Sequence, residues 1–176
     1  MLDEPLAELS LEGIVDVHVH PLPMLSEEEL LREVRSARVR KAVLLALDVD
    51  PSVLDEPRSR AKFMEELFNA GVWNLRALEN ARELLRLART PNERVAELAK
   101  RHPDAFLGFG SVNPSRPSSY VRETLAQISD LGLAGVKLLP TLQLFCPNKA
   151  KRKLKAILRF CERENLVAMF HTGCDP

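Results

Sequence analysis

The sequence of 176 residues predicts an α/β fold, namely a (β/α)8-type barrel of which this chain carries the first five strands. Short apolar runs recur along the chain, and most of them are followed by a helical pattern. The runs are nearly all apolar and do not alternate, as expected of parallel strands that are buried on both faces. The unusual polar residues fall at the carboxyl ends of these runs, where α/β barrels carry their chemistry.

The first strand is expected over residues 14–20, and Pro21 ends it. Because side chains alternate along an extended chain, Asp16, His18 and His20 are predicted to share one face. Two imidazoles at this spacing suit a single divalent transition metal. The alternative is a pair of solvated histidines on an edge strand. We favour the metal site, because a valine-rich strand buried on both faces is a poor place for unpaired imidazoles.

The next strand follows a helix. Ser26 precedes three glutamates in a capping-box pattern, which predicts a helix over residues 26–38. A second buried strand is expected over residues 41–47. Residues 48–90 then interrupt the strand–helix rhythm, and we interpret them as a helical insertion that forms a lid beside the site. The helical patterns in this insertion cover about residues 60–69 and 75–89.

The rest of the chain resumes the rhythm. We expect a helix from Thr90 to Arg101, strands at 106–112, 135–140 and 166–174, and helices at about 118–131 and 148–165. The last helix is rich in Lys and Arg, but it lacks the interleaved aromatic residues of a nucleic-acid surface and is interpreted as a solvated exterior. Lys137 and His171 fall at the carboxyl ends of the fourth and fifth strands, so the four polar residues His18, His20, Lys137 and His171 predict one site. Residues 1–176 are expected to form a single partial barrel domain.

Composition restricts the partners. Lys plus Arg and Asp plus Glu both number 25, so no net charge attracts nucleic acid or an acidic membrane. Three cysteines are an odd number, which argues against a disulfide framework and for a reducing cytoplasm. The acidic first residues are unlike a signal peptide, and no apolar run approaches the ~20 residues of a membrane span. We expect a cytoplasmic protein that acts on a small molecule, and a homodimer that covers the open edges of the sheet.

Several stretches together resemble the amidohydrolase superfamily, in the branch of metal-dependent hydrolases and aminocarboxymuconate-semialdehyde-type decarboxylases. In the family's order they are residues 16–21 (DVHVHP), 92–99 (NERVAELA), 102–114 (HPDAFLGFGSVNP), 135–140 (GVKLLP) and 171–173 (HTG). The resemblance implies that His18, His20 and His171 bind a divalent metal, Zn²⁺ first, with Mn²⁺ and Fe²⁺ as alternatives. It also implies a hydrolase in which metal-activated water attacks an amide- or ester-type bond.

Two other functions stay open: a metal-dependent decarboxylase on the same scaffold, and a truncated, non-catalytic remnant that binds metal. The resemblance implies a further histidine from a sixth strand and a catalytic aspartate from an eighth, and no residue here matches either. The chain is therefore expected to be a fragment. Histidinol-phosphatase-like phosphoesterases and TatD-type nucleases also begin with His-x-His, and these nucleases usually carry a glutamate ligand where Lys137 stands.

Two further residues are candidates for the site. Lys137 has three readings: a carboxylated bridge between two metals, a substrate contact, or a structural lysine. Asp16 is expected to orient a liganding histidine, because such histidines commonly donate their other nitrogen to a carboxylate. Cys146 and Cys174 are interpreted as loop residues and not as ligands.

Overall fold

The strands form one parallel sheet in the order β1-β2-β3-β4-β5, as a computed structural model of the chain shows for residues 13–69 and 76–172. The elements in chain order are β1 (Val15–Val19), α1 (Glu27–Ser36), β2 (Lys41–Leu45), the 3-10 turn η1 (Pro51–Asp55), α2 (Pro57–Asn69), α3 (Arg76–Ala88), α4 (Asn92–Arg101), β3 (Phe106–Ser111), α5 (Ser118–Asp130), β4 (Gly135–Leu138), α6 (Lys151–Arg163) and β5 (Val167–Phe170). Consecutive parallel strands joined by helical crossovers make a half-barrel, so the predicted fold class is confirmed.

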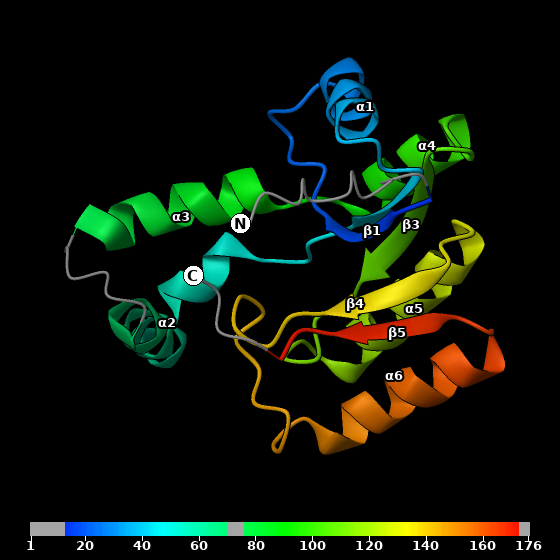
Figure 1. The fold of residues 1–176 in the computed structure, drawn as a ribbon. Coiled ribbons are helices and arrows are strands. Elements are labelled where there is room, and N and C mark those ends of the chain that lie inside the picture. The colour runs from blue at the N-terminus through cyan, green and yellow to red at the C-terminus, as the bar shows by residue number, and fades with distance from the viewer. Residues whose placement is uncertain (1–12, 70–75, 173–176) are drawn as a thin grey trace, which may run out of the picture.

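Figure 1 shows how the layers lie. Helices α1, α4, α5 and α6 lie on the outer side of the sheet, and α2 and α3 lie beyond the ends of the strands to which the arrows point. The carboxyl ends of the strands therefore face the helices of the insertion. Within the described part of the chain, no helix is long and apolar enough to cross a lipid bilayer.

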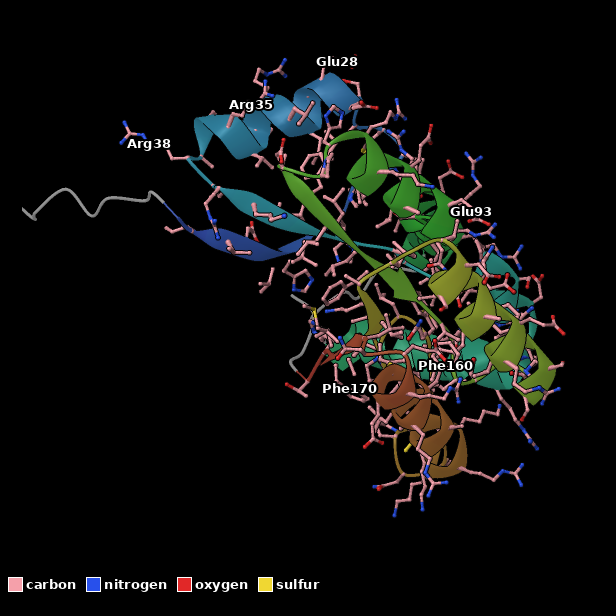
Figure 2. The ribbon with its side chains drawn as sticks, turned by 90° about the vertical axis from the view of Figure 1, so that its right-hand side faces the viewer. Glu28, Arg35, Arg38, Glu93, Phe160 and Phe170 are labelled. Carbon is pink, nitrogen blue, oxygen red and sulfur yellow. The ribbon has the colours of Figure 1, made fainter. Side chains whose placement is uncertain are left out.

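Helix α1 begins where the sequence predicts. The Ser26 hydroxyl accepts the backbone N–H of Glu29 at 3.2 Å, and the Glu29 carboxylate accepts the backbone N–H of Ser26 at 2.9 Å. This is the reciprocal capping box. Leu30 is buried under the helix, whereas Glu28 and Arg35 point away from the strands in Figure 2. The capping pattern and the apolar spacing thus decide both the start of α1 and the face that it packs against the sheet.

The strands pack on two sides. The side that faces the helices belongs to the main core, whose strand residues include Ala42, Leu44, Ala46, Phe106, Val136 and Leu138. The opposite side, which faces the barrel interior, carries a second cluster of Val43, Leu45 and Phe109, with Ala134 and Met169 packed against it. Gly110 of β3 allows α5 to approach closely, because a Cβ there would lie 2.5 Å from a side-chain carbon of Ile128.

The expectation that the outer strands are buried on both faces is wrong. Val17 of β1 is 52% exposed and Val167 of β5 is 56% exposed. Among residues 13–69 and 76–172, each of these strands pairs with one neighbour, β1 with β2 and β5 with β4. An apolar strand is buried on both faces only when the sheet continues beyond it, and these two strands are the ends of the half-barrel. The histidines of β1 therefore lie on an edge strand after all.

The insertion is attached to the carboxyl end of the sheet. Leu47 and Thr90 exchange backbone hydrogen bonds of 2.9 and 3.2 Å, which close its base. A third apolar cluster then joins the insertion to the sheet; it consists of Leu47, Val49, Leu54, Phe63, Leu85 and Leu139. Leu139 directly follows β4, so the insertion packs against the end of the strand that carries Lys137.

Candidate functional site

Two histidine side chains lie side by side at the end of β1. Nε2 of His18 is 3.1 Å from Nε2 of His20, and Nδ1 of His20 is 3.2 Å from the backbone carbonyl oxygen of Leu45. A carbonyl only accepts hydrogen bonds, so neutral His20 carries its proton on Nδ1 and keeps a lone pair on Nε2. The backbone of β2 therefore leaves Nε2 of His20 ready to act as a ligand.

His171 comes to the same place from the other end of the sheet. The curvature of the half-barrel brings its ring centroid to 6.0 Å from that of His18, with the two rings nearly perpendicular at 89°. Its backbone N–H donates to the Leu138 carbonyl at 2.9 Å, which holds the residue beside β4. His171 thus lies beside His18, at the edge of the sheet where the sequence predicts it.

The pair of nitrogens fits a metal ion, whereas the full triad is not yet assembled. The two Nε2 atoms are 3.1 Å apart, and zinc–imidazole bonds are about 2.0–2.1 Å long. An ion held by both atoms would therefore have an N–metal–N angle of about 100°, close to that of tetrahedral coordination. Imidazole nitrogen is a donor that Zn²⁺, Mn²⁺ and Fe²⁺ all accept. In the described residues, however, no three side chains of His, Cys, Asp or Glu are arranged to hold an ion together. His171 has to move toward the pair, and its role as third ligand stays a prediction.

Asp16 contacts the backbone. Its Oδ1 accepts the backbone N–H of His18 at 2.9 Å. By register, Asp16 pairs with Ala42 and Val19 with Leu44, so three steps on β1 match two steps on β2. This register shift lies within the stretch from Asp16 to Val19, for which the sequence predicts strict alternation. The role of Asp16 in orienting a ligand stays a prediction.

Lys137 is enclosed in the sheet. It is 1% exposed and pairs in register with Ser111 of β3 and Met169 of β5. Met169 belongs to the interior cluster, so Lys137 lies on the barrel side of β4. This position suits a substrate contact or a metal-bridging group, and the role of Lys137 stays a prediction.

The sequence analysis missed a buried polar network beside Lys137. The Gln143 side-chain N–H group donates to the Ser111 hydroxyl at 3.0 Å and to the Val112 carbonyl at 3.1 Å, and its Oε1 accepts the Leu139 N–H at 2.9 Å. Asn92 holds the Ser111 backbone from the other side, with bonds of 2.7 and 3.2 Å. The available signal was a polar residue inside the apolar run of residues 142–145, because such a residue must find partners when it is buried.

Asp48 and Tyr120 join the start of the insertion to α5. The Tyr120 hydroxyl donates to Oδ2 of Asp48 at 2.6 Å. Burial raises the pKa of the Asp48 carboxyl, although hydrogen bonds from Tyr120 and from the backbone of Asn113 oppose the rise. Burial and the neighbouring Asp48 together raise the pKa of the Tyr120 hydroxyl to about 12. Arg116 lies over the Tyr120 ring at 5.3 Å and donates to Asp50 at 2.6 Å, which extends the same connection.

Tyr120 allows a direct test of this contact, because it is the single tyrosine of the sequence. Its pKa in the folded protein lies above the unfolded value, so its stabilising contribution is present below pH ~10 and is lost as the pH rises toward the folded pKa of about 12. We expect the ultraviolet absorbance of tyrosinate to appear near pH 12 in folded protein. Asp48→Asn should move this titration to lower pH. A wild-type titration at the ordinary tyrosine pKa would show that the contact is absent in solution.

Two hollows of the surface lie away from the histidines. One of about 470 Å³ is lined by α5 and α6, with Arg122, Arg152, Lys153 and Phe160 among its residues. The second, of about 340 Å³, includes Cys146 and shares Arg152 and Lys153 with the first. The first lies between α5 and α6, and the second is lined by the loops that follow β3 and β4 and by the start of α6. Cys146 lines the second hollow, and Cys174 lies outside the described residues.

The comparisons with known proteins decide the family. Residues 15–176 match the amidohydrolase family. The chain belongs to the amidohydrolase family. The matched segment contains every predicted site residue and all five strands in full. No curated protein sequence matches the chain.

Solved structures share the fold of this amidohydrolase chain. A 5-carboxyvanillate decarboxylase from Novosphingobium aromaticivorans, with bound manganese, matches at 21% identity and a TM-score of 0.52, over 86% of this chain and 36% of that one. A 2,6-dihydroxybenzoate decarboxylase matches at 16% identity and a TM-score of 0.51, over 94% of this chain and 52% of that one. A probable 2-pyrone-4,6-dicarboxylic acid hydrolase from Acinetobacter baumannii matches at 15% identity and a TM-score of 0.49, over 91% of this chain and 49% of that one. The chain thus spans about half the length or less of these structures.

Proposed function

We propose that this chain is the metal-binding half of an amidohydrolase-family enzyme, in which His18, His20 and His171 hold one divalent ion. The observation that carries the proposal is the contact of two imidazole Nε2 atoms at 3.1 Å, with the third ring beside them. We place Zn²⁺ first and Mn²⁺ and Fe²⁺ as alternatives, because all three accept imidazole nitrogen.

The remaining residues have distinct roles in this proposal. When bound, the ion is a Lewis acid that polarises a substrate oxygen or a water molecule. Nε2 of His20 would be available to hold the ion, because the Leu45 carbonyl keeps the proton on Nδ1. The ammonium group of Lys137, on the interior side of β4, attracts an anionic or carbonyl oxygen of a small-molecule substrate. The apolar cluster around Leu139 holds the insertion against this edge.

Hydrolysis of an amide- or ester-type bond is the first candidate reaction, and decarboxylation is the second. Decarboxylation is kept because two of the structures with this fold are decarboxylases of aromatic carboxylic acids by name. A buried lysine near a metal suits both reactions, since each begins with an oxygen anion or a carbonyl that must be oriented.

Metal content tests the proposal first. We expect about one zinc, manganese or iron ion per 19.8-kDa chain by elemental analysis together with intact mass. The loaded protein is then assayed for release of CO₂ from hydroxybenzoates and for hydrolysis of cyclic esters and amides. No bound metal at full mass would overturn the proposal. Bound metal without either product would favour the non-catalytic remnant.

We also propose that the open edges pair with a second copy. Ile14, Val15 and Val17 on one side and Val167 and Phe170 on the other are exposed apolar residues on the two end strands. Light scattering coupled to gel filtration should therefore give twice the chain mass of 19.8 kDa. A mass of a single chain at micromolar concentration would contradict the dimer.

A further inference from the structure

The peptide group between Leu138 and Leu139 connects the candidate site to a buried side chain. Its carbonyl, on Leu138, accepts the backbone N–H of His171 at 2.9 Å. Its N–H, on Leu139, donates to Oε1 of Gln143 at 2.9 Å. A peptide group is planar, so a side chain that fixes the direction of the N–H also fixes the direction of the carbonyl on the other side.

Gln143 is itself held in place. It is 1% exposed, and its amide donates to the Ser111 hydroxyl at 3.0 Å and to the Val112 carbonyl at 3.1 Å. A longer contact of 3.4 Å reaches the Asp48 carbonyl, at the start of the insertion. One side chain from the loop after β4 therefore bonds to the ends of β3 and β4 and reaches the segment that follows β2.

The same network fixes the backbone of Lys137. The Ser111 hydroxyl donates to the Lys137 carbonyl at 3.3 Å, and Gln143 donates to that hydroxyl. Lys137 and His171 are thus both tied to the network through backbone atoms. Through these backbone bonds Gln143 acts on where the two residues stand.

We infer that Gln143 is a positioning residue, which sets the backbone position of His171, through the Leu138–Leu139 peptide group, and that of Lys137. This inference deepens the proposed function, because it assigns the part of the chain that holds the third histidine in reach of the other two. The acceptor atom Oε1 acts on His171, and the donor nitrogen acts on the end of β3.

Two substitutions separate the role of the acceptor oxygen of Gln143 from that of its donor nitrogen. Gln143→Met keeps the volume but removes both the donor and the acceptor. Gln143→Glu keeps an acceptor oxygen for the Leu139 N–H in either protonation state. Both variants lose stability, because each changes a buried polar group. If Gln143 is a positioning residue, the backbone of His171 becomes more mobile in Gln143→Met and stays in place in Gln143→Glu.

Backbone mobility at His171 is measured by amide hydrogen exchange, followed by NMR on the full chain without metal. The readout is the exchange rate of the His171 amide divided by that of the Ala46 amide, which donates to the Phe109 carbonyl within the sheet. Gln143→Met should raise the ratio about tenfold, as expected for the loss of one buried hydrogen bond, while Gln143→Glu stays near wild type. Ile157→Val, a fully buried site in α6, is the matched control for lost stability and should leave the ratio unchanged. An unchanged ratio in Gln143→Met, or an equal rise in Ile157→Val, would overturn the inference.

Titration with zinc alone distinguishes this inference from the proposed function. We expect Gln143→Met to bind zinc about tenfold more weakly than wild type, in the range found for residues that orient ligands, and Gln143→Glu to restore the affinity. If wild type binds no zinc, the proposed function fails and the exchange ratio still decides the role of Gln143. If Gln143→Met does not fold, exchange of the Leu139 amide in the wild type tests the inference instead. Exchange at the rate of an open loop would show that the hydrogen bond from Leu139 to Gln143 does not form and would overturn the inference.

Discussion

Replacing His18 by alanine is expected to lower the affinity of the chain for zinc by more than about 100-fold, and His20→Ala should do the same. Structural zinc sites bind with about 10–16 kcal/mol from four ligands, so one ligand contributes about 3 kcal/mol. The two Nε2 atoms are 3.1 Å apart, so either substitution leaves an ion with a single imidazole from β1. The measurement is competition with a chromophoric chelator at constant pH.

His102→Ala is the matched control for these variants. His102 caps α4 and its Nε2 contacts the Glu27 carboxylate at 2.5 Å, in a place with no part in the candidate site. It should leave zinc affinity unchanged. His171→Ala tests the third ligand, and an intermediate loss is expected because this ring lies 6.0 Å from His18 and has to move. Wild-type affinity in His18→Ala would remove the basis of the proposed site.

Gly135→Ala is expected to destabilise the half-barrel by about 3 kcal/mol or more, the upper part of the range for overpacked sites. A Cβ at Gly135 would lie 2.6 Å from the backbone oxygen of Val167 and 2.8 Å from the ring of Phe109. The backbone oxygen belongs to β5, which has β4 as its neighbour, so the clash pushes the end strand away from the sheet. Urea unfolding followed by circular dichroism measures the loss.

Gly108→Ala provides the comparison, because its Cβ would also lie 2.6 Å from the nearest atom, but that atom is the tip of the Leu133 side chain. A side chain can change rotamer whereas a paired strand cannot shift without losing its hydrogen bonds. We therefore expect Gly108→Ala to cost clearly less than Gly135→Ala. Equal losses would mean that β5 yields easily in solution. Loss of β5 would also carry His171 away, so Gly135→Ala should weaken zinc binding as well.

Local order was enough to predict where the candidate residues stand along the strands, whereas their roles as ligands stay predictions. His18, His20, Lys137 and His171 follow or end apolar runs, and the carboxyl ends of parallel strands meet at one edge whatever the details of packing. The capping box at Ser26 is equally local, since its two hydrogen bonds join residues three apart. Period and spacing were enough for these features, and the family resemblance agreed with them.

The features that depend on distant parts of the chain were not predictable in this way. The register shift between Asp16 and Val19 arises in the pairing of β1 with β2. Gln143 reaches Val112 and Asp48, which are 31 and 95 positions away in the sequence, and no local pattern indicates such partners.

The sequence by itself thus determined the order and direction of the strands and the edge at which the polar residues gather, because hydrophobic period and strand ends are local properties. Only the tertiary structure decided that β1 and β5 are exposed end strands, that His18 and His20 touch while His171 stands apart, and that Gln143 ties the strand ends together. Burial and hydrogen-bond partners depend on which neighbours a strand has, and that is a property of the assembled sheet.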